Sequence, residues 1–189
     1  MKKFELTSEF ITNIFGTKLF RIKALVEFGN VKKGEFGGYV EKEENLSQDG
    51  NAWVYGNAWV CGNAEVYGNA EVYGNAWVCG DAKVCGNAEV CGDAKVCGNA
   101  WVYGNAKVCG DAKVYGNADY AIAQGFGSEY RATTFFRTKS GEIGVRCGCF
   151  YGNLSEFRKK VVETHGETKK AKEYLMLADL MEFRFSDNS

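Results

Sequence analysis

The stretch that decides the fold is GNAWVYGNAWVCGNAEVYGNAEVYGNAWVCG, residues 50–80. Gly, then Asn or Asp, then Ala recur in it every six residues, and the unit continues to a degenerate GNADYA at residues 116–121. This period matches neither the 3.6-residue repeat of a helix nor the two-residue repeat of an ordinary strand. A short unit repeated about a dozen times is typical of a β-solenoid.

Each position of the unit has a physical role in such a fold. Valine, as at Val54 and Val60, is β-branched and suits a pleated surface that faces the interior. Alanine, as at Ala58, is small enough to point inward near a corner, and Gly-Asn tolerates the positive φ of a tight turn. The chain contains no proline, which fits a parallel ladder that uses its backbone N–H groups.

Three hexads per coil would stack residues eighteen apart at about 4.8 Å. The outward positions then form one column on each side of the prism. This arrangement places Glu65 beside Lys83, Glu89 beside Lys107, and Trp59 on Trp77, which cross-strand pairing favours. The three predicted columns are Trp53, Glu71, Glu89 and Lys107; Trp59, Trp77, Lys95 and Lys113; and Glu65, Lys83 and Trp101.

The segments that flank the array carry a family resemblance. RIKALVEFGNVKKGEFGGYVEKEENLS precedes it, and TTFFRT, VRCGCF, EFRKKVVETHG and AKEYLMLADL follow it. Together they resemble hexapeptide-repeat proteins of phages, prophages and bacteria, which are often labelled transferases or polymer-forming proteins. The resemblance implies a left-handed β-helix, and it implies no particular activity.

The predicted fold class is mainly β, in three parts. Residues 1–37 form an N-terminal β cap that contains a hairpin around Asn13–Gly16, residues 38–121 form the β-helix, and residues 122–189 form a small α+β domain. In this last part we expect a hairpin of residues 130–138 and 142–150, then a helix from Leu154 to His165 and a second one from about residue 168 to 180. The alternating residues 181–185 could end that helix or form a strand.

Composition limits the compartment and the partners. The net charge of −1 gives no overall electrostatic attraction to nucleic acid. The sequence lacks an apolar run that could cross a membrane and a signal peptide, so we expect a cytoplasmic protein without membrane or nucleic-acid partners. Six of the eight cysteines share one repeat position with tyrosine, which predicts reduced thiols rather than a disulfide framework.

Catalytic chemistry has weak support in the sequence. Hexapeptide acyltransferases use a histidine on a coil as general base, but the single histidine, His165, lies outside the array. Cys147 and Cys149, two residues apart on a predicted strand, would face the same way and form a minor candidate polar site with His165. Three ligands without a second pair do not indicate a metal site, so we expect no metal, no cofactor and no catalytic residue.

Outward aromatic side chains are the stronger functional signal. Three interpretations stay open: structural ladders, a homo-oligomer interface, or stacking on a planar ligand. We therefore predict a non-catalytic scaffold that self-associates, with a trimer favoured, and whose C-terminal domain can bind a protein partner. The alternative is an acyltransferase-like enzyme or a small-molecule binder, for example of a nucleotide, with a cleft between subunits. The candidate residues are Trp53, Trp59, Trp77, Trp101, Tyr55 and Tyr73.

Overall fold

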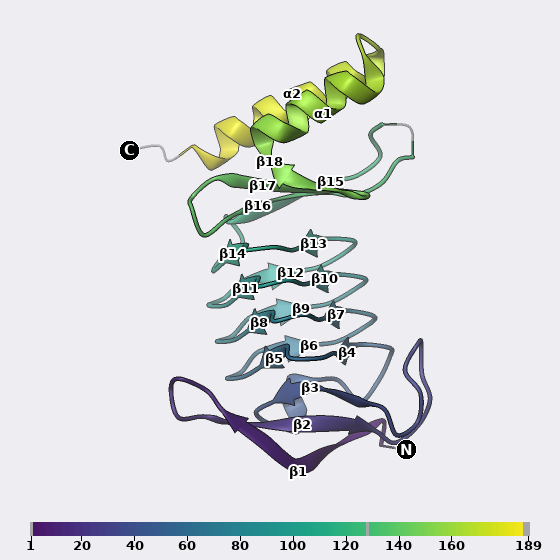
Figure 1. The fold of residues 1–189 in the computed structure, drawn as a ribbon, viewed down its shortest axis with the longest axis vertical. Helices are drawn as coiled ribbons and strands as arrows, with labels where there is room; N and C mark the ends of the chain where they lie inside the picture. The colour runs from purple at the N-terminus through teal and green to yellow at the C-terminus, as the bar shows by residue number, and fades with distance from the viewer. Residues whose placement is uncertain (1, 128, 187–189) are drawn as a thin grey trace.

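A computed structural model describes residues 2–127 and 129–186 of the protein (Figure 1). It has a β-solenoid in the middle, an antiparallel β cap at the N-terminal end, and a sheet covered by two helices at the C-terminal end. The fold is mainly β, as the six-residue repeat predicts. No helix within the described ranges is long and apolar enough to cross a membrane.

The solenoid is built from two-residue strands on three sides. Its strands are β4 (Trp53–Val54), β5 (Trp59–Val60), β6 (Glu65–Val66), β7 (Glu71–Val72), β8 (Trp77–Val78), β9 (Lys83–Val84), β10 (Glu89–Val90), β11 (Lys95–Val96), β12 (Trp101–Val102), β13 (Lys107–Val108) and β14 (Lys113–Val114). The first side contains β5, β8, β11 and β14, the second β4, β7, β10 and β13, and the third β6, β9 and β12. All these pairs are parallel and join residues eighteen apart, such as Glu89 and Lys107, so the predicted columns are confirmed.

Inside the coils, the valine and alanine side chains form one core with no solvent exposure. At the corners, asparagine side chains form ladders: Asn51, Asn69 and Asn87 each donate to the next residue of their column, at 3.1 Å. Asp81 and Asp93 join similar ladders as acceptors from Asn63 and Asn75. Aspartate therefore fits the corner because its oxygen receives the amide proton from the coil before it.

The N-terminal cap continues the first side of the solenoid. Strands β1 (Phe4–Thr12), β2 (Lys18–Ala24) and β3 (Phe36–Val40) are antiparallel, and β3 then pairs in parallel with β5. A short 3-10 helix, η1 (Glu43–Asn45), follows. Val40 pairs with Val60 and Leu46 with Val66, so the first coil is two residues longer than the regular ones. Val40 and Leu46 are six residues apart, so the six-residue spacing of inward residues already begins at Val40, within the predicted range of residues 38–121.

Lys3 is the buried cation of this cap. Its side chain is only 4% exposed. The ammonium donates to the carbonyl oxygen of Ala52 at 3.0 Å and lies 4.8 Å from the ring centre of Phe28. Burial lowers the pKa of Lys3 to about 8, and nearby Asp49 opposes this effect.

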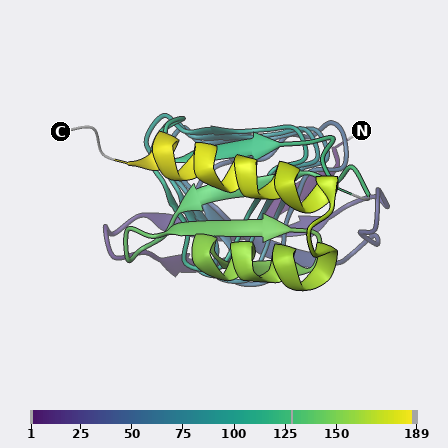
Figure 2. The same ribbon diagram turned by 90° about the horizontal axis from the view of Figure 1, so that it is seen from above.

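The C-terminal unit is a four-stranded antiparallel sheet under two helices. Its strands are β15 (Tyr120–Ala123), β16 (Thr133–Arg137), β17 (Ile143–Cys147) and β18 (Phe150–Asn153), in that order across the sheet. Helices α1 (Leu154–His165) and α2 (Lys169–Phe185) lie side by side over one face (Figure 2). Phe135 belongs to the core under the helices, and the next residue, Phe136, belongs to the solenoid core. The sheet is thus the layer between the two.

The structure decides between the two alternatives for residues 181–185 and adds two strands to the predicted hairpin. Residues 181–185 continue α2, and Met181 and Phe185 are buried one turn apart, so the alternative of a strand is wrong. Strands β15 and β18 were not expected. The first helix has the predicted bounds: Asn153 caps it by accepting from the Glu156 N–H, and it ends at His165, with Gly166 as its C-cap.

Alanine substitutions at two corner glycines test how closely the coils approach one another. Gly86 and Gly104 have φ of 69° and 70°, but a Cβ on Gly86 would lie 3.0 Å from the Gly104 nitrogen, whereas a Cβ on Gly104 meets nothing within 4 Å. We expect Gly104→Ala to lower the free energy of unfolding by about 1–2 kcal/mol through backbone strain. Gly86→Ala should lower it more in urea denaturation, and equal losses would contradict the close contact between coils.

Lys3 predicts how stability changes with pH. The folded state holds the ammonium proton of Lys3 less tightly than the unfolded state does, because the pKa of Lys3 is about 8 in the folded protein and 10.5 in the unfolded chain. The free energy of unfolding should therefore rise as the pH increases above 8. Urea denaturation between pH 7 and 9.5 should show this rise in the wild type and a smaller one in Lys3→Met. Parallel profiles for the two proteins would contradict a buried, charged Lys3.

Candidate functional site

Trp53 is not on the surface, so its prediction as an exposed stacking residue is wrong. Its side chain has no exposure. The rings of Phe4 and Phe28 contact it edge-on, with centroids at 6.1 and 5.3 Å. Trp53 is the first residue of its column, and the N-terminal cap packs over that position. It is part of the core that joins cap and solenoid.

Trp59 and Trp77 form a ladder on the first side of the solenoid. Their rings are stacked with centroids 4.0 Å apart. The Lys95 ammonium lies 4.6 Å from the ring centre of Trp77, and Phe15 of the β1–β2 turn contacts the same ring at 6.1 Å. The stack predicted from the eighteen-residue spacing is confirmed. These contacts half-bury both indoles and favour the structural interpretation of this column.

Tyr55 and Tyr73 lie along the second side and bind carboxylates. The Tyr55 hydroxyl donates to Glu71 at 3.4 Å, and the Tyr73 hydroxyl donates to Glu89 at 3.0 Å. Burial, followed by the neighbouring carboxylate, raises the pKa of each tyrosine to about 12. Glu89 also pairs with Lys107, so this side is a network of polar contacts.

Trp101 and Tyr103 are the exposed aromatic residues of the third side. They are 47% and 51% exposed, and their rings lie 5.5 Å apart. The third side ends at β12, where Asn117 Oδ1 accepts from the Trp101 N–H at 2.8 Å and Tyr120 donates to its carbonyl oxygen at 2.6 Å. A groove follows β12 and is lined by Trp101, Tyr103, Tyr120, Ile122 and Arg184. The six predicted aromatic residues therefore occupy different sides and do not form one surface.

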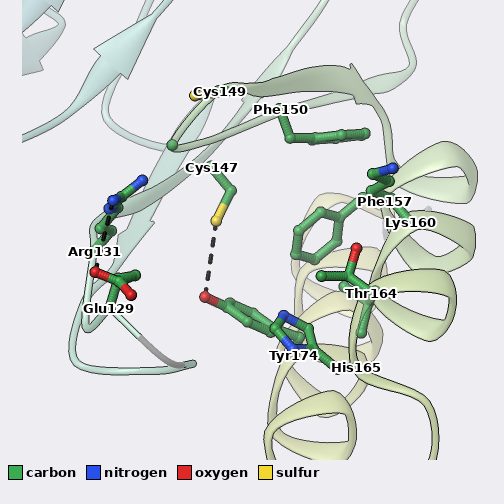
Figure 3. Close-up of a pocket in the computed structure, with 12 residues that line it drawn as sticks. Glu129, Arg131, Cys147, Cys149, Phe150, Phe157, Lys160, Thr164, His165 and Tyr174 are labelled. Atoms are coloured by element: carbon green, nitrogen blue, oxygen red, sulfur yellow. Dashed lines mark hydrogen bonds and ion pairs between the residues drawn. The ribbon is translucent and has the colours of Figure 1, made fainter.

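The minor candidate residues Cys147, Cys149 and His165 do come together. They line one cavity of about 280 Å³ between the β17–β18 turn and the two helices (Figure 3). Cys149 is in the turn, because β17 ends at Cys147 and Cys147 already pairs with Phe150 on β18. The prediction that both cysteines share one strand face is wrong. Gly148, with φ of 56°, makes this reversal possible.

Tyr174 of α2 organises the interior of this cavity. Its hydroxyl lies 3.9 Å from the Cys147 sulfur and donates to the Phe126 carbonyl oxygen at 3.3 Å. The His165 ring stacks on the Tyr174 ring with centroids 5.8 Å apart. Thr133 donates its hydroxyl proton to the Cys147 sulfur at 3.1 Å. Burial, followed by Cys147, raises the pKa of Tyr174 to about 12, so this hydroxyl stays protonated at neutral pH.

Apolar walls and a charged rim complete the cavity. Phe150, Phe157 and Val161 form the walls, while Arg131 and Lys160 provide cations and Glu129 provides an anion. The sequence analysis missed Tyr174, Arg131 and Glu129. A signal existed for Tyr174 alone, since it lies on the buried face of α2 with Ala171 and Ala178. Arg131 and Glu129 precede β16, which begins at Thr133, whereas the sequence prediction placed Arg131 inside that strand.

Metal ligation has no support in the residues that the structure describes. Within them, no group of three or more His, Cys, Asp and Glu side chains is arranged to hold an ion. Cys147 and His165 contact opposite parts of Tyr174, one its hydroxyl and the other its ring.

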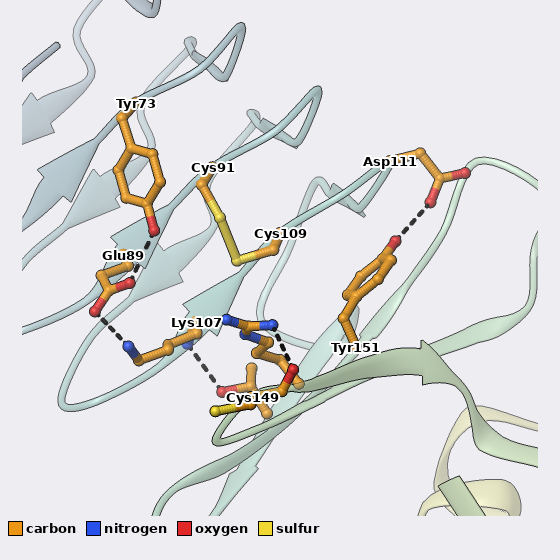
Figure 4. Close-up of a disulfide and its surroundings, with 10 residues drawn as sticks. Tyr73, Glu89, Cys91, Lys107, Cys109, Asp111, Cys149 and Tyr151 are labelled. Carbon is orange, nitrogen blue, oxygen red and sulfur yellow. Dashed lines mark hydrogen bonds and ion pairs between the residues drawn. A yellow bond between two sulfur atoms is a disulfide. The ribbon is translucent and has the colours of Figure 1, made fainter. Parts of the chain in front are cut away.

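The expectation of reduced thiols is wrong for four of the cysteines. Cys91 is bonded to Cys109 (Figure 4), and Cys79 is bonded to Cys97, with Cα atoms 4.6 Å apart in both pairs. The coil spacing itself causes this, because 4.6 Å is within the range of about 4.4–6.8 Å that a disulfide spans. Cys61, Cys85, Cys147 and Cys149 are free, and the first two are buried.

Comparison with known proteins gives a partial match. A family model described as the YdcK beta solenoid repeat matches residues 64–80, which lie within the array. No curated protein matches the chain. The match agrees with the solenoid in the structure, and it covers neither the N-terminal cap nor the cavity of the C-terminal unit.

Alkylation followed by peptide mass spectrometry tests the cysteine arrangement. In the folded, non-reduced protein, iodoacetamide should modify the exposed Cys149 first and the half-buried Cys147 more slowly. Cys61 and Cys85 should react only after unfolding, because they are buried, and burial also raises the pKa of the Cys61 thiol. The four bonded cysteines should react only after reduction. Alkylation of Cys79 or Cys91 without reduction would contradict the disulfides.

Proposed function

We propose that the protein is a non-catalytic β-solenoid scaffold that associates with copies of itself and presents its C-terminal unit to a partner. The observation that carries the proposal is the exposed Trp101–Tyr103 pair beside the groove at the end of the third side. Elsewhere on the solenoid, the outward aromatic residues predicted as candidates are covered, stacked or hydrogen-bonded.

A scaffold role is supported by the way the coils hold one another. Backbone N–H groups along the array donate to carbonyl oxygens of the following coil, for example Lys83 to Ala100 at 2.9 Å. Asparagine ladders, ion pairs and two disulfides connect the same coils through their side chains. A rod with this many links between coils is suited to hold its two ends at a fixed separation.

Self-association is supported by the chemistry of the groove. Trp, Tyr and Arg are enriched at protein interfaces and dominate their binding energy, and Trp101, Tyr103 and Arg184 combine all three types. Most other outward positions on the three sides carry lysine or glutamate, which suits solvent better than a dry interface. We favour a closed trimer, in which a head-to-tail contact is used three times.

The resemblance of the flanking segments extends this proposal. It supports a left-handed hexapeptide solenoid of phage or prophage origin. An acyltransferase-like enzyme is the weaker alternative, because the single histidine of the chain lies in α1 and not on a coil. A binder of small molecules between subunits would use the same groove, with the aromatic pair as a stacking surface.

Native mass spectrometry of the purified protein tests the proposal. We expect a single closed oligomer, with the trimer favoured and no retained small molecule. Trp101→Ser combined with Tyr103→Ser should shift it to monomer, because these substitutions remove the exposed aromatic surface. Met176→Ser is the matched control, since Met176 is 70% exposed on α2 and does not line the groove.

The possible outcomes distinguish the two functions and the two surfaces. A wild-type monomer at micromolar concentration would contradict self-association. Dissociation by Met176→Ser but not by the double variant would move the interface to α2. A reproducible additional mass of a few hundred daltons per oligomer, lost in the double variant, would favour the small-molecule alternative.

A further inference from the structure

We propose that the cavity between the β17–β18 turn, α1 and α2 binds a small organic anion with a flat aromatic body. This site lies within one chain and does not depend on self-association. The proposal rests on the shape of the cavity, the chemistry of its walls, the charges at its rim and one strained residue in the segment that supplies the rim.

Shape and walls set the body of the ligand. The cavity volume of about 280 Å³ is close to the lower end of the range of about 300–1,000 Å³ typical of small-molecule sites. Phe150, Phe157 and Val161 provide apolar walls, and the stacked rings of His165 and Tyr174 provide a flat one (Figure 3). Flat aromatic walls favour a planar aromatic ligand through offset or edge-on ring contacts.

The rim sets the charge of the ligand. Arg131 and Lys160 come from opposite borders of the cavity, and Glu129 is the single acid that lines it. Arg131 pairs with Glu129 at 3.7 Å, and Lys160 pairs with Glu163 at 3.7 Å, but all four side chains are more than half exposed. Exposed pairs of this kind contribute about 0–1 kcal/mol, so either cation can exchange its partner for a ligand carboxylate or sulfonate.

Backbone strain at Tyr130 indicates that the rim is held in a particular form. Tyr130 has φ of 50°, and no other non-glycine residue in the described part of the chain has positive φ. This conformation costs about 1–2 kcal/mol for an L-residue. It occurs between Glu129 and Arg131, both of which line the cavity. Strained residues that the surrounding structure maintains are concentrated at ligand sites.

Fluorescence titration with 8-anilinonaphthalene-1-sulfonate tests the site, because this probe combines aromatic rings with an anionic group. The wild type should bind one probe per chain saturably. Lys160→Glu should weaken binding about three- to tenfold, since a cation at the rim becomes an anion. Lys159→Glu is the matched control, because it makes the same change on the adjacent residue, which does not line this cavity.

Two further measurements separate this site from other apolar surfaces. The uncharged analogue N-phenyl-1-naphthylamine should bind the wild type and Lys160→Glu with similar affinity. Saturating sulfonate probe should slow alkylation of Cys147, which faces the cavity, in the wild type. Equal weakening by the two lysine substitutions, or unchanged alkylation of Cys147, would overturn the proposal. Loss of probe binding in Phe183→Ser would instead place it on the outer face of α2, where Phe183 is 71% exposed.

Discussion

The stacking of each residue on the one eighteen positions later is the constraint on which the rest of the structure depends. In the two disulfide pairs, the stacked Cα atoms lie 4.6 Å apart. This is close to the spacing of neighbouring strands in a sheet, so the coils form a continuous parallel ladder. This spacing requires small inward residues, because consecutive coils add valine and alanine to the same narrow core. It also requires glycine at the corners, where the next coil passes close to the position of a Cβ.

The same spacing places each outward side chain next to the equivalent side chains of the neighbouring coils. These neighbours determine which outward groups stay free to bind a ligand. Opposite charges pair at Glu65 and Lys83, and the amide ladders continue along the corners. Groups that would otherwise be free to bind a ligand are therefore committed to each other. The two places that we propose for binding, the groove after β12 and the cavity under the helices, lie where the repeat ends.

Sequence reasoning was sufficient where the repeat is regular, because one spacing then fixes the neighbours along each column. The columns and the Trp59–Trp77 stack followed directly from this spacing, and the first helix followed from its own helical pattern. Sequence reasoning failed where local turns and contacts between distant segments determine the structure. The cap covers Trp53, and the turn at Gly148 separates Cys149 from the strand. The cavity was half predicted, because His165, Cys147 and Cys149 were named, but Tyr174, which brings them into one site, is distant in sequence from the two cysteines.

The number of coils has a consequence for any scaffold built this way. Adding eighteen residues keeps every column in register and lengthens the rod by one coil, about 4.8 Å. Adding six would move the C-terminal unit to another side of the prism relative to the N-terminal cap, although the local repeat would be intact. Phe136 lies in the solenoid core and Phe135 in the core under the helices, so one strand fixes that unit on the last coil. The orientation of the cavity relative to the N-terminal cap is therefore set by where the array ends, and the distance between that cap and the C-terminal unit is set by how many complete coils the array contains.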